Sequence, residues 1–310
     1  MKLALVFPGQ GSQTVGMMQT FAELPAVRET FDEASDVLKQ DLWKLAAEGP
    51  AEELNATVNT QPLMLTAAYA VYRAWQAAGG ATPAVVAGHS LGEYTALVAA
   101  GVIAFKDALP LVRYRAEVMQ GAVAEGVGAM AAILGLDDDT VRQVCAEAAQ
   151  GEVVEAVNLN SPGQVVIAGN KAAVERGMEL AKEKGAKRAL PLPVSVPSHC
   201  ALMKPAAAEL AKYLESVTMT SSQIPVIHNA DVAAYDDAAK IKDALVRQLY
   251  SPVRWVETVQ NVHQQGILAT AECGPGKVLA GLTKRIVAEL PCVALVNQEA
   301  FEEAKTLFSA

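Results

Sequence analysis

Five short apolar runs divide this chain of 310 residues, and their alternation with longer segments restricts its fold more than any other feature. The runs lie at residues 3–7, 84–87, 224–227, 267–271 and 293–296. The segments between them have helical spacing, and the clearest helix is expected to start at Thr60-Gln61-Pro62 and to stop at Gly79-Gly80. This alternation predicts an α/β fold with a mostly parallel sheet covered by helices.

Residues 126–195 follow a different order. Strands are predicted at residues 129–134, 153–159, 165–168 and 188–192, and helices at residues 138–149 and 172–184. The resulting βαββαβ order is typical of a ferredoxin-like unit, with a turn between its central strands at residues 160–163. We therefore expect a large α/β domain at residues 1–125 and 196–310 and a small inserted domain at residues 126–195. A boundary between domains is a usual place for a substrate cleft.

A candidate nucleophile lies where a predicted strand runs into a predicted helix. The segment Gly88-His89-Ser90-Leu91-Gly92 matches the Gly-x-Ser-x-Gly pattern, and a helix is expected at residues 94–100. In this context the glycines permit a sharp turn that exposes the Ser90 hydroxyl. The helix N-terminus also places partial positive charge where an oxyanion would form. The alternative is a chance match in an ordinary loop, which the flanking strand and helix disfavour.

A serine hydroxyl needs a base, and the chain has four histidines. His199 follows the proline-containing segment at residues 193–198 and stands at the start of a predicted helix, so we expect it to be rigidly held. Packing or solvation explains the other three more simply: His89 lies inside the turn, His228 ends a strand, and His263 lies on a polar helix face.

The carboxylate of a Ser-His-Asp triad is not evident. In the usual α/β-hydrolase order it would lie between the nucleophile and the histidine. Most acidic residues in that interval belong to the inserted domain, and helix capping suffices to explain Asp137, Asp138 and Asp139. We therefore expect a Ser–His dyad whose imidazole is oriented by a group other than a carboxylate, for which a backbone carbonyl is suited.

The loop that follows the first strand is a candidate for oxyanion binding. Its sequence, FPGQGSQ at residues 7–13, allows backbone N–H groups to face a pocket. It fails as a dinucleotide-binding fingerprint because Thr14 occupies the position of the third glycine. The N–H groups of Gln10 and Leu91 would form a two-donor oxyanion hole. The alternative is a tight turn without such a role.

Two arginines in a helix predicted at residues 107–120 lie on different faces. Arg113 has Glu117 one turn further on, so we expect a solvated, ion-paired position. Arg115 has only apolar neighbours three and four residues away, which are Leu111, Val112, Val118 and Met119. A buried guanidinium needs an anion, and its planar fork fits a carboxylate. Either a substrate or an acidic residue of the protein would supply that anion.

Composition excludes several classes of function. The chain has 25 Lys and Arg against 34 Asp and Glu and only 5% aromatic residues, so we expect no nucleic acid partner. Its four cysteines form no CxxC pair, so we expect no metal site and a reducing compartment. The first apolar run has five residues, which is too short to span a membrane. We therefore expect a cytoplasmic protein without a membrane partner.

Five motifs occur together in one order along the chain. They are GQGSQ, GHSLGEY, Arg115-x-x-x-Met119-Gln120, SPGQVVIAG and VPSH. In this order and spacing they closely resemble the malonyl-CoA:acyl-carrier-protein transacylases of bacterial type II fatty acid synthesis, over nearly the whole chain. The architecture that this resemblance implies, a hydrolase-like domain with a ferredoxin-like insert, agrees with the pattern described above.

The resemblance also implies the site residues. They comprise a nucleophile and its base, two backbone oxyanion donors, three substrate-binding side chains and a backbone carbonyl that orients the base: Ser90 and His199; Gln10 and Leu91; Arg115, Gln61 and Asn160; and Gln248. In this assignment Arg115 pairs with the free malonyl carboxylate.

The implied reaction transfers malonyl from malonyl-CoA to the phosphopantetheine thiol of acyl carrier protein, by a ping-pong mechanism through a malonyl-serine that supplies fatty acid biosynthesis. Malonyl-CoA and acyl carrier protein are then the expected partners. We expect no tightly bound cofactor and a monomer. Two alternatives stay open: a serine thioesterase or esterase of hydrolase-like fold, and a non-catalytic acyl-binding protein.

The net charge of −9 affects binding of the carrier protein, because the resemblance implies an acidic acyl carrier protein as the partner. Two acidic proteins repel each other at long range unless the charge is unevenly distributed. Residues 240–285 nevertheless carry a net charge of +4, and residues 182–188 form a second basic run. Either run is a candidate docking surface, and Lys284 and Arg285 provide the test of the first. The alternative is that both are solvated helix faces.

Overall fold

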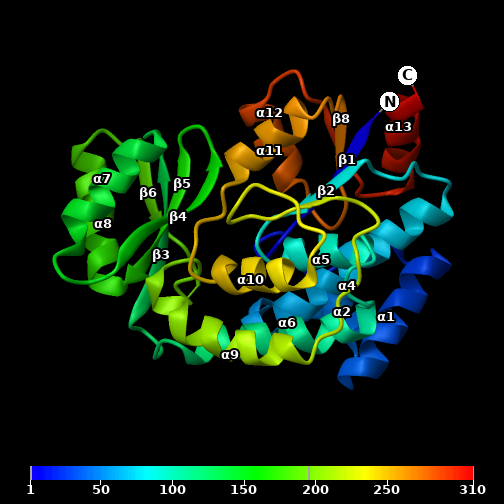
Figure 1. The fold of residues 1–310 in the computed structure, drawn as a ribbon, viewed down its shortest axis with the longest axis horizontal. Coiled ribbons are helices and arrows are strands. Elements are labelled where there is room, and N and C mark those ends of the chain that lie inside the picture. Colours follow the sequence, from blue (N-terminus) through cyan, green and yellow to red (C-terminus); the bar gives the residue numbers. More distant parts are fainter. Residues whose placement is uncertain (1, 195, 310) are drawn as a thin grey trace.

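The computed structural model describes residues 2–194 and 196–309, which form two sheets with helices around them (Figure 1). The five-stranded sheet has the order β7-β2-β1-β8-β9 and is parallel throughout. Its strands are β1 (Leu3–Phe7), β2 (Val85–Gly88), β7 (Val226–Ile227), β8 (Ala269–Glu272) and β9 (Cys292–Ala294). Helices cover both faces, which explains why these strands are mostly apolar. Thr270 and Glu272 in β8 are the exceptions.

Alternating side chains of β1 point into two different cores. Leu3, Leu5 and Phe7 pack in the larger core, and Ala4 and Val6 pack in a smaller core on the other face. The helices around these cores are α1 (Pro25–Leu38), α2 (Leu42–Glu48), α3 (Ala51–Asn55), α4 (Thr57–Ala77), α5 (Gly92–Ala99), α6 (Phe105–Gly121), α9 (Lys204–Glu215), α10 (Ala238–Gln248), α11 (Trp255–Gln264), α12 (Val278–Ile286) and α13 (Gln298–Ser309). Two short 3-10 helices lie at Gln19–Phe21 and Ala201–Met203. The predicted α/β architecture is confirmed.

The second sheet is antiparallel and has the order β4-β5-β3-β6. It consists of β3 (Gly128–Leu134), β4 (Val154–Ser161), β5 (Gln164–Asn170) and β6 (Arg188–Pro191), with α7 (Asp138–Ala149) and α8 (Lys171–Glu183) packed on a separate core. The predicted βαββαβ order is confirmed. The division into domains at residues 126 and 196 stays a prediction.

The two sheets are connected by more than the chain itself. The backbone N–H of Leu159 in β4 donates to the carbonyl of Val253 at 3.0 Å, and the N–H of Val253 donates to the carbonyl of Val157 at 2.8 Å. These two hydrogen bonds dock β4, an edge strand of the small sheet, against the loop that precedes α11. They hold the two sheets in a defined orientation across the candidate site.

Helix α4 begins earlier in the chain than predicted. Pro62 was expected near the first helical turn, but the helix begins at Thr57 and Pro62 lies inside it. The proline removes one helical hydrogen bond. Most of α4 is buried, including Pro62 itself, so packing outweighs that loss.

Among the residues that the structure describes, no helix is both long and apolar enough to cross a membrane.

Candidate active site

Ser90 lies at the sharp turn between β2 and α5. Its backbone has φ 51°, in the left-handed region that disfavours side chains with Cβ. A Cβ on Gly88 would lie 1.9 Å from the backbone of Gly92, and one on Gly92 would lie 2.1 Å from the carbonyl oxygen of Phe7. Both glycines are therefore required for β1, the turn and α5 to pack this closely. The turn leaves Ser90 only half-buried at the edge of a cavity.

His199 lies within hydrogen-bonding distance of Ser90. The Ser90 Oγ and the His199 Nε2 are 2.8 Å apart. On the other side of the ring, Nδ1–H donates to the backbone carbonyl of Gln248 at 2.7 Å. This contact fixes the tautomer that leaves Nε2 free to accept a proton. Ser195, in the segment before the histidine, lies outside the described residues.

The environment of His199 favours the neutral imidazole. The ring is buried, and burial, followed by the nearby charge of Arg115, lowers the pKa of His199 from 6.5 to about 3. The hydrogen bond to the Gln248 carbonyl opposes this shift. An imidazole that is unprotonated at neutral pH can accept the Ser90 proton.

Gln10 and Leu91 both line the cavity beside Ser90. The loop that carries Gln10 packs tightly on the turn, because a Cβ on Gly9 would lie 2.3 Å from the carbonyl oxygen of His89. Within the described part of the chain, neither the Gln10 N–H nor the Leu91 N–H donates a hydrogen bond. Leu91 also precedes the first residue of α5, where the helix dipole is positive. Both N–H groups are therefore free to donate to an anionic oxygen.

Arg115 in α6 is buried without an ion pair to any described carboxylate. Its Nη1 donates to Gln61 Oε1 at 2.7 Å and its Nη2 donates to Gln248 Oε1 at 2.9 Å. Nη2 also lies 3.4 Å from Ser90 Oγ, and the Tyr94 ring lies 5.3 Å from the guanidinium carbon. Burial lowers the pKa of Arg115. Amides thus hold a cation beside the nucleophile while leaving its charge without a paired anion.

The cavity at Ser90 has a volume of about 610 Å³. Strands of the small sheet line one side of it, and the loops that follow β1 and β2 of the large sheet line the other. Asn160, in β4 of the small sheet, accepts a hydrogen bond at its Oδ1 from His89 Nε2 at 2.8 Å. Gln61, on α4, also lines the cavity. Of the predicted site residues, only Gln248 lies beneath the cavity and not in its wall. The structure therefore brings the other seven predicted site residues together around Ser90.

Three buried residues beneath the turn were not identified from the sequence as part of the site. Asn229 accepts the Ser90 N–H at Oδ1 and donates from Nδ2 to the Gly88 carbonyl, at 2.8 and 2.6 Å. Glu93 binds the Nδ1 of His228 at 2.7 Å. His228 was expected to be structural, and it is buried in this contact. A glutamate in the first turn of the otherwise uncharged helix after Ser90 was the available signal, since a buried carboxylate requires partners.

Two other sequence expectations concern charged side chains outside the cavity. Arg113 was expected to pair with Glu117 on a solvated face, but it is half-buried and donates to Gln40 instead. Because α6 packs close to α1, the Arg113 side chain contacts the loop after α1 and does not extend into solvent. His263 is partly exposed, and its Nε2 lies 3.7 Å from a carboxylate oxygen of Glu289.

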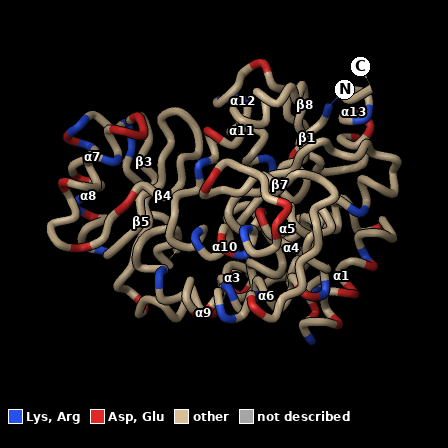
Figure 2. The backbone as a smooth tube through the Cα atoms, in the orientation of Figure 1, with Lys and Arg blue, Asp and Glu red and all other residues tan. Residues whose placement is uncertain are grey.

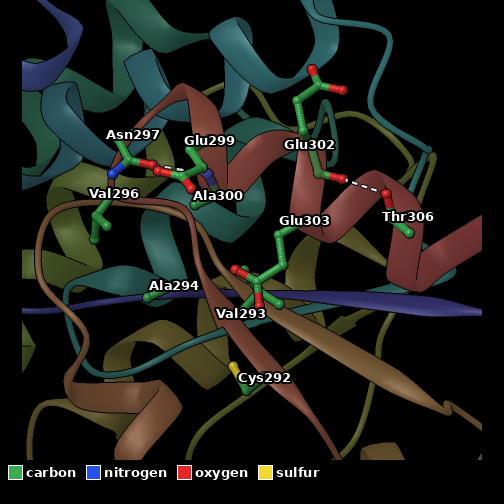
Figure 3. Close-up of a pocket in the computed structure, with 10 residues that line it drawn as sticks. All are labelled: Cys292, Val293, Ala294, Val296, Asn297, Glu299, Ala300, Glu302, Glu303 and Thr306. Carbon is green, nitrogen blue, oxygen red and sulfur yellow. Dashed lines mark hydrogen bonds between the residues drawn. The ribbon is translucent and has the colours of Figure 1, made fainter.

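A second cavity, of about 680 Å³, lies between β9 and α13 (Figure 3). Its lining includes Glu299, Glu302 and Glu303 but no histidine or serine. Burial raises the pKa of the Cys292 thiol, the nucleophilic atom in its wall, to about 12. It therefore offers no activated nucleophile. Across residues 2–194 and 196–309, no cluster of three or more His, Cys, Asp or Glu side chains could hold a metal ion.

Comparisons with known proteins agree on one family. Residues 4–300 match the acyl transferase domain family. The chain is 59% identical to a malonyl CoA-acyl carrier protein transacylase of Haemophilus influenzae, over 97% of each chain. Its structure is similar to that of an acyl-carrier-protein S-malonyltransferase from Burkholderia pseudomallei, with a TM-score of 0.98, 65% identity and coverage of 99% of this chain and 100% of the other. A malonyl-transacylase solved in complex with its type II PKS acyl-carrier protein also has a TM-score of 0.98, with 55% identity and coverage of 99% and 100%.

Proposed function

The chain belongs to the acyltransferase family of malonyl CoA-acyl carrier protein transacylases, and we propose that Ser90 and His199 carry out its chemistry. The protein transfers malonyl from malonyl-CoA to acyl carrier protein and so supplies fatty acid biosynthesis. The observation that carries the residue assignment is the 2.8 Å contact between Ser90 Oγ and a buried His199 Nε2. The same hydroxyl lies 3.4 Å from Arg115.

The proposed first half-reaction acylates Ser90. His199 Nε2 takes the hydroxyl proton while Oγ attacks the thioester carbonyl of malonyl-CoA. The N–H groups of Gln10 and Leu91 stabilise the oxyanion of the tetrahedral intermediate. When the C–S bond breaks, the CoA sulfur takes the proton from the imidazolium. The products are free CoA and malonyl-Ser90.

The second half-reaction follows the same path in reverse with a different thiol. His199 takes the proton of the carrier's phosphopantetheine thiol, whose sulfur attacks the malonyl-Ser90 ester carbonyl. The same two backbone N–H groups hold the oxyanion. Ser90 leaves and regains its proton from the imidazolium. Because acyl transfer between thiols balances with these groups, we propose that the protein needs no tightly bound cofactor.

An intact-mass experiment tests the assignment of Ser90. Mixing the protein with malonyl-CoA in the absence of carrier is expected to add one malonyl mass, and adding carrier protein is expected to remove it. Ser90→Ala is expected to abolish the adduct, with Ser198→Ala, another cavity-lining serine, as the matched control. Rapid release of free malonate without carrier would instead indicate a hydrolase. An adduct retained in Ser90→Ala would refute the assignment.

We propose that Arg115 selects the substrate by pairing with the malonyl carboxylate. Its support is the buried guanidinium without a paired anion, held by Gln61 and Gln248 beside Ser90. Arg115→Ala is expected to lower kcat/KM for malonyl-CoA by about a hundredfold, because a desolvated charge-assisted pair is lost, and to affect acetyl-CoA far less. Arg113→Ala on the same helix is the control. Equal losses with the two thioesters would exclude this role.

We also propose a cytoplasmic location and a monomeric state. Four free cysteines support a reducing compartment. A single chain contributes every residue of the proposed site, so catalysis requires no second subunit. Light scattering after size-exclusion chromatography is expected to give a mass near 32.5 kDa. A mass near twice that value would contradict the monomer.

A further inference from the structure

Glu93 lies at the centre of the contacts beneath the active site. It is in the first turn of α5, three residues after Ser90, and its side chain is fully buried. Its Oε1 accepts a hydrogen bond from His228 Nδ1 at 2.7 Å. Its Oε2 accepts from the Asn229 backbone N–H at 2.8 Å and from Gln248 Nε2 at 3.0 Å. One carboxylate therefore holds two distant chain segments to the helix that follows the nucleophile.

Gln248 connects Glu93 to the substrate-binding Arg115 and to the base His199. Its side-chain Nε2 donates to Glu93, and its Oε1 accepts from Arg115 at 2.9 Å. Its backbone carbonyl accepts from His199 Nδ1 at 2.7 Å. A shift of this one residue would displace both the cation that faces the acyl group and the carbonyl that orients the base.

The amide of Gln248 also separates two buried opposite charges. Arg115 on one side makes its hydrogen bonds to two amides and a hydroxyl and lies near an aromatic ring, with no ion pair to a described carboxylate. Burial lowers its pKa, and electrostatic interactions with Tyr94 and Glu93 act in the opposite direction. Because a buried cation requires a compensating partner, Glu93 also supports the charge of Arg115 while the pocket is empty.

We propose that Glu93 is a positioning residue, which acts through Gln248 to place Arg115 for the malonyl carboxylate and His199 for proton transfer. This proposal rests on the proposed function, because it assumes that Arg115 binds malonyl. Glu93 is not among the residues that line the cavity. Its effect on the reaction must therefore pass through the residues that it holds.

Two substitutions separate the geometry of Glu93 from its charge. Glu93→Asp keeps the charge but withdraws the carboxylate by one methylene, about 1.5 Å, and so stretches the contact with Gln248. Glu93→Gln removes the charge but keeps an oxygen where Gln248 and Asn229 donate. Its new NH₂ group would face His228 Nδ1, which can accept by moving its proton to Nε2. That Nε2 has no hydrogen-bond partner among the described residues.

The readout is the ratio of kcat/KM for malonyl-CoA to kcat/KM for acetyl-CoA. Glu93→Asp is expected to lower this ratio about fivefold, the effect of losing one ordinary hydrogen bond. Glu93→Gln is expected to leave the ratio at or above that of the unsubstituted protein, because it keeps the acceptor and removes a negative charge near the malonyl site. Glu272→Gln, a buried carboxylate at the end of β8, is the control and should not change the ratio.

A second measurement tests the route through Gln248. In a Gln248→Ala background, which keeps the backbone carbonyl, Glu93→Asp is expected to change the ratio less than twofold. A full fivefold effect in that background would show that Glu93 does not act through the side chain of Gln248 and would overturn the proposal.

Other outcomes are equally informative. Equal losses of malonyl and acetyl transfer in Glu93→Asp would assign Glu93 a purely structural role and overturn the proposal. If Glu93→Asp does not fold, Glu93→Gln decides alone: a ratio that is maintained supports the proposal, and a tenfold fall overturns it. Arg115→Ala, measured in parallel, separates the two inferences, because an unchanged ratio in that variant contradicts the proposed function itself.

Discussion

His199 combines two features that an isolated histidine lacks. Its φ of 66° is strained for a residue with a Cβ, and the backbone hydrogen bond from its N–H to the Leu249 carbonyl, at 3.0 Å, helps to hold that conformation. Its ring is buried against a cation, Arg115. The first feature aims Nε2 at Ser90, and the second keeps it unprotonated. Together they prepare the base before any substrate binds.

The lowered pKa of His199 predicts an unusual pH dependence. The base acts when neutral, so its activity is lost only as pH falls toward its pKa of about 3. We expect the rate of Ser90 malonylation, followed by quenched-flow mass measurement, to change less than twofold between pH 8 and pH 5. A histidine with the ordinary pKa of about 6.5 would lose roughly thirtyfold at pH 5. A fall of that size, with the protein still folded by circular dichroism, would contradict the shift.

Sequence reasoning identified residues whose local pattern carries chemical information. The glycines around Ser90 and the rigid approach to His199 fall in this class, and so does the apolar neighbourhood of Arg115. Glu93 and Asn229 do not, because their importance depends on contacts with residues more than a hundred positions away. The family resemblance identified the backbone carbonyl of Gln248 as the hydrogen-bond acceptor for His199, but not the contacts that its side chain makes with Arg115 and Glu93.

At the level of elements, the turn between β2 and α5 depends on glycine for space. We expect Gly92→Ala to lower the free energy of unfolding by about 3 kcal/mol or more, because its Cβ would lie 2.1 Å from the Phe7 backbone oxygen. Gly281→Ala in α12, where nothing lies within 4 Å of the added Cβ, is the matched control and should gain about 0.5–1 kcal/mol. Urea titration measures both. Equal effects would show that the crowding at Gly92 is relieved by movement.

Element boundaries were less predictable than element types. α7 falls at its expected residues because Asp137 caps its first turn with a side-chain hydrogen bond to the Thr140 N–H. α4 starts before its expected position because the signal at Pro62 was overridden by burial of nearly the whole helix. β7 contains only two residues of the run at 224–227. Local capping is visible in a sequence, whereas the extent of tertiary burial is not.

At the level of the whole molecule, the cavity exists because two sheets meet. The order of predicted strands and helices in the sequence indicated each sheet. It did not indicate the backbone hydrogen bonds between β4 and Val253 that connect the small sheet to the large domain. Arg285 in α12 adds a second connection, since its Nη1 donates to Gln164 Oε1 of β5 at 2.7 Å. Gln164 lines the cavity. The basic last turn of α12 therefore lies close to the cavity that a carrier's prosthetic arm must enter.

The same geometry makes α12 the stronger of the two candidate docking surfaces. Lys284 and Arg285 are exposed and form no ion pair with a described residue. Lys182 and Lys184, by contrast, pair with Glu179 at 2.8 Å and with Glu147 at 3.3 Å. Figure 2 shows the Lys and Arg residues of α7 and α8 interleaved with Asp and Glu. An acidic partner would find less uncompensated positive charge there.

Charge reversal at each pair separates docking from net charge. Lys284→Glu with Arg285→Glu is expected to raise the KM for acyl carrier protein about tenfold at low salt, measured from preformed malonyl-enzyme, because attraction to an acidic partner is lost. The increase should shrink in 0.5 M salt, where screening shortens the range of surface charges. Lys182→Glu with Lys184→Glu changes the net charge equally and should raise that KM less than twofold. Equal increases would mean that overall charge acts, and no increase in the α12 pair would exclude this surface.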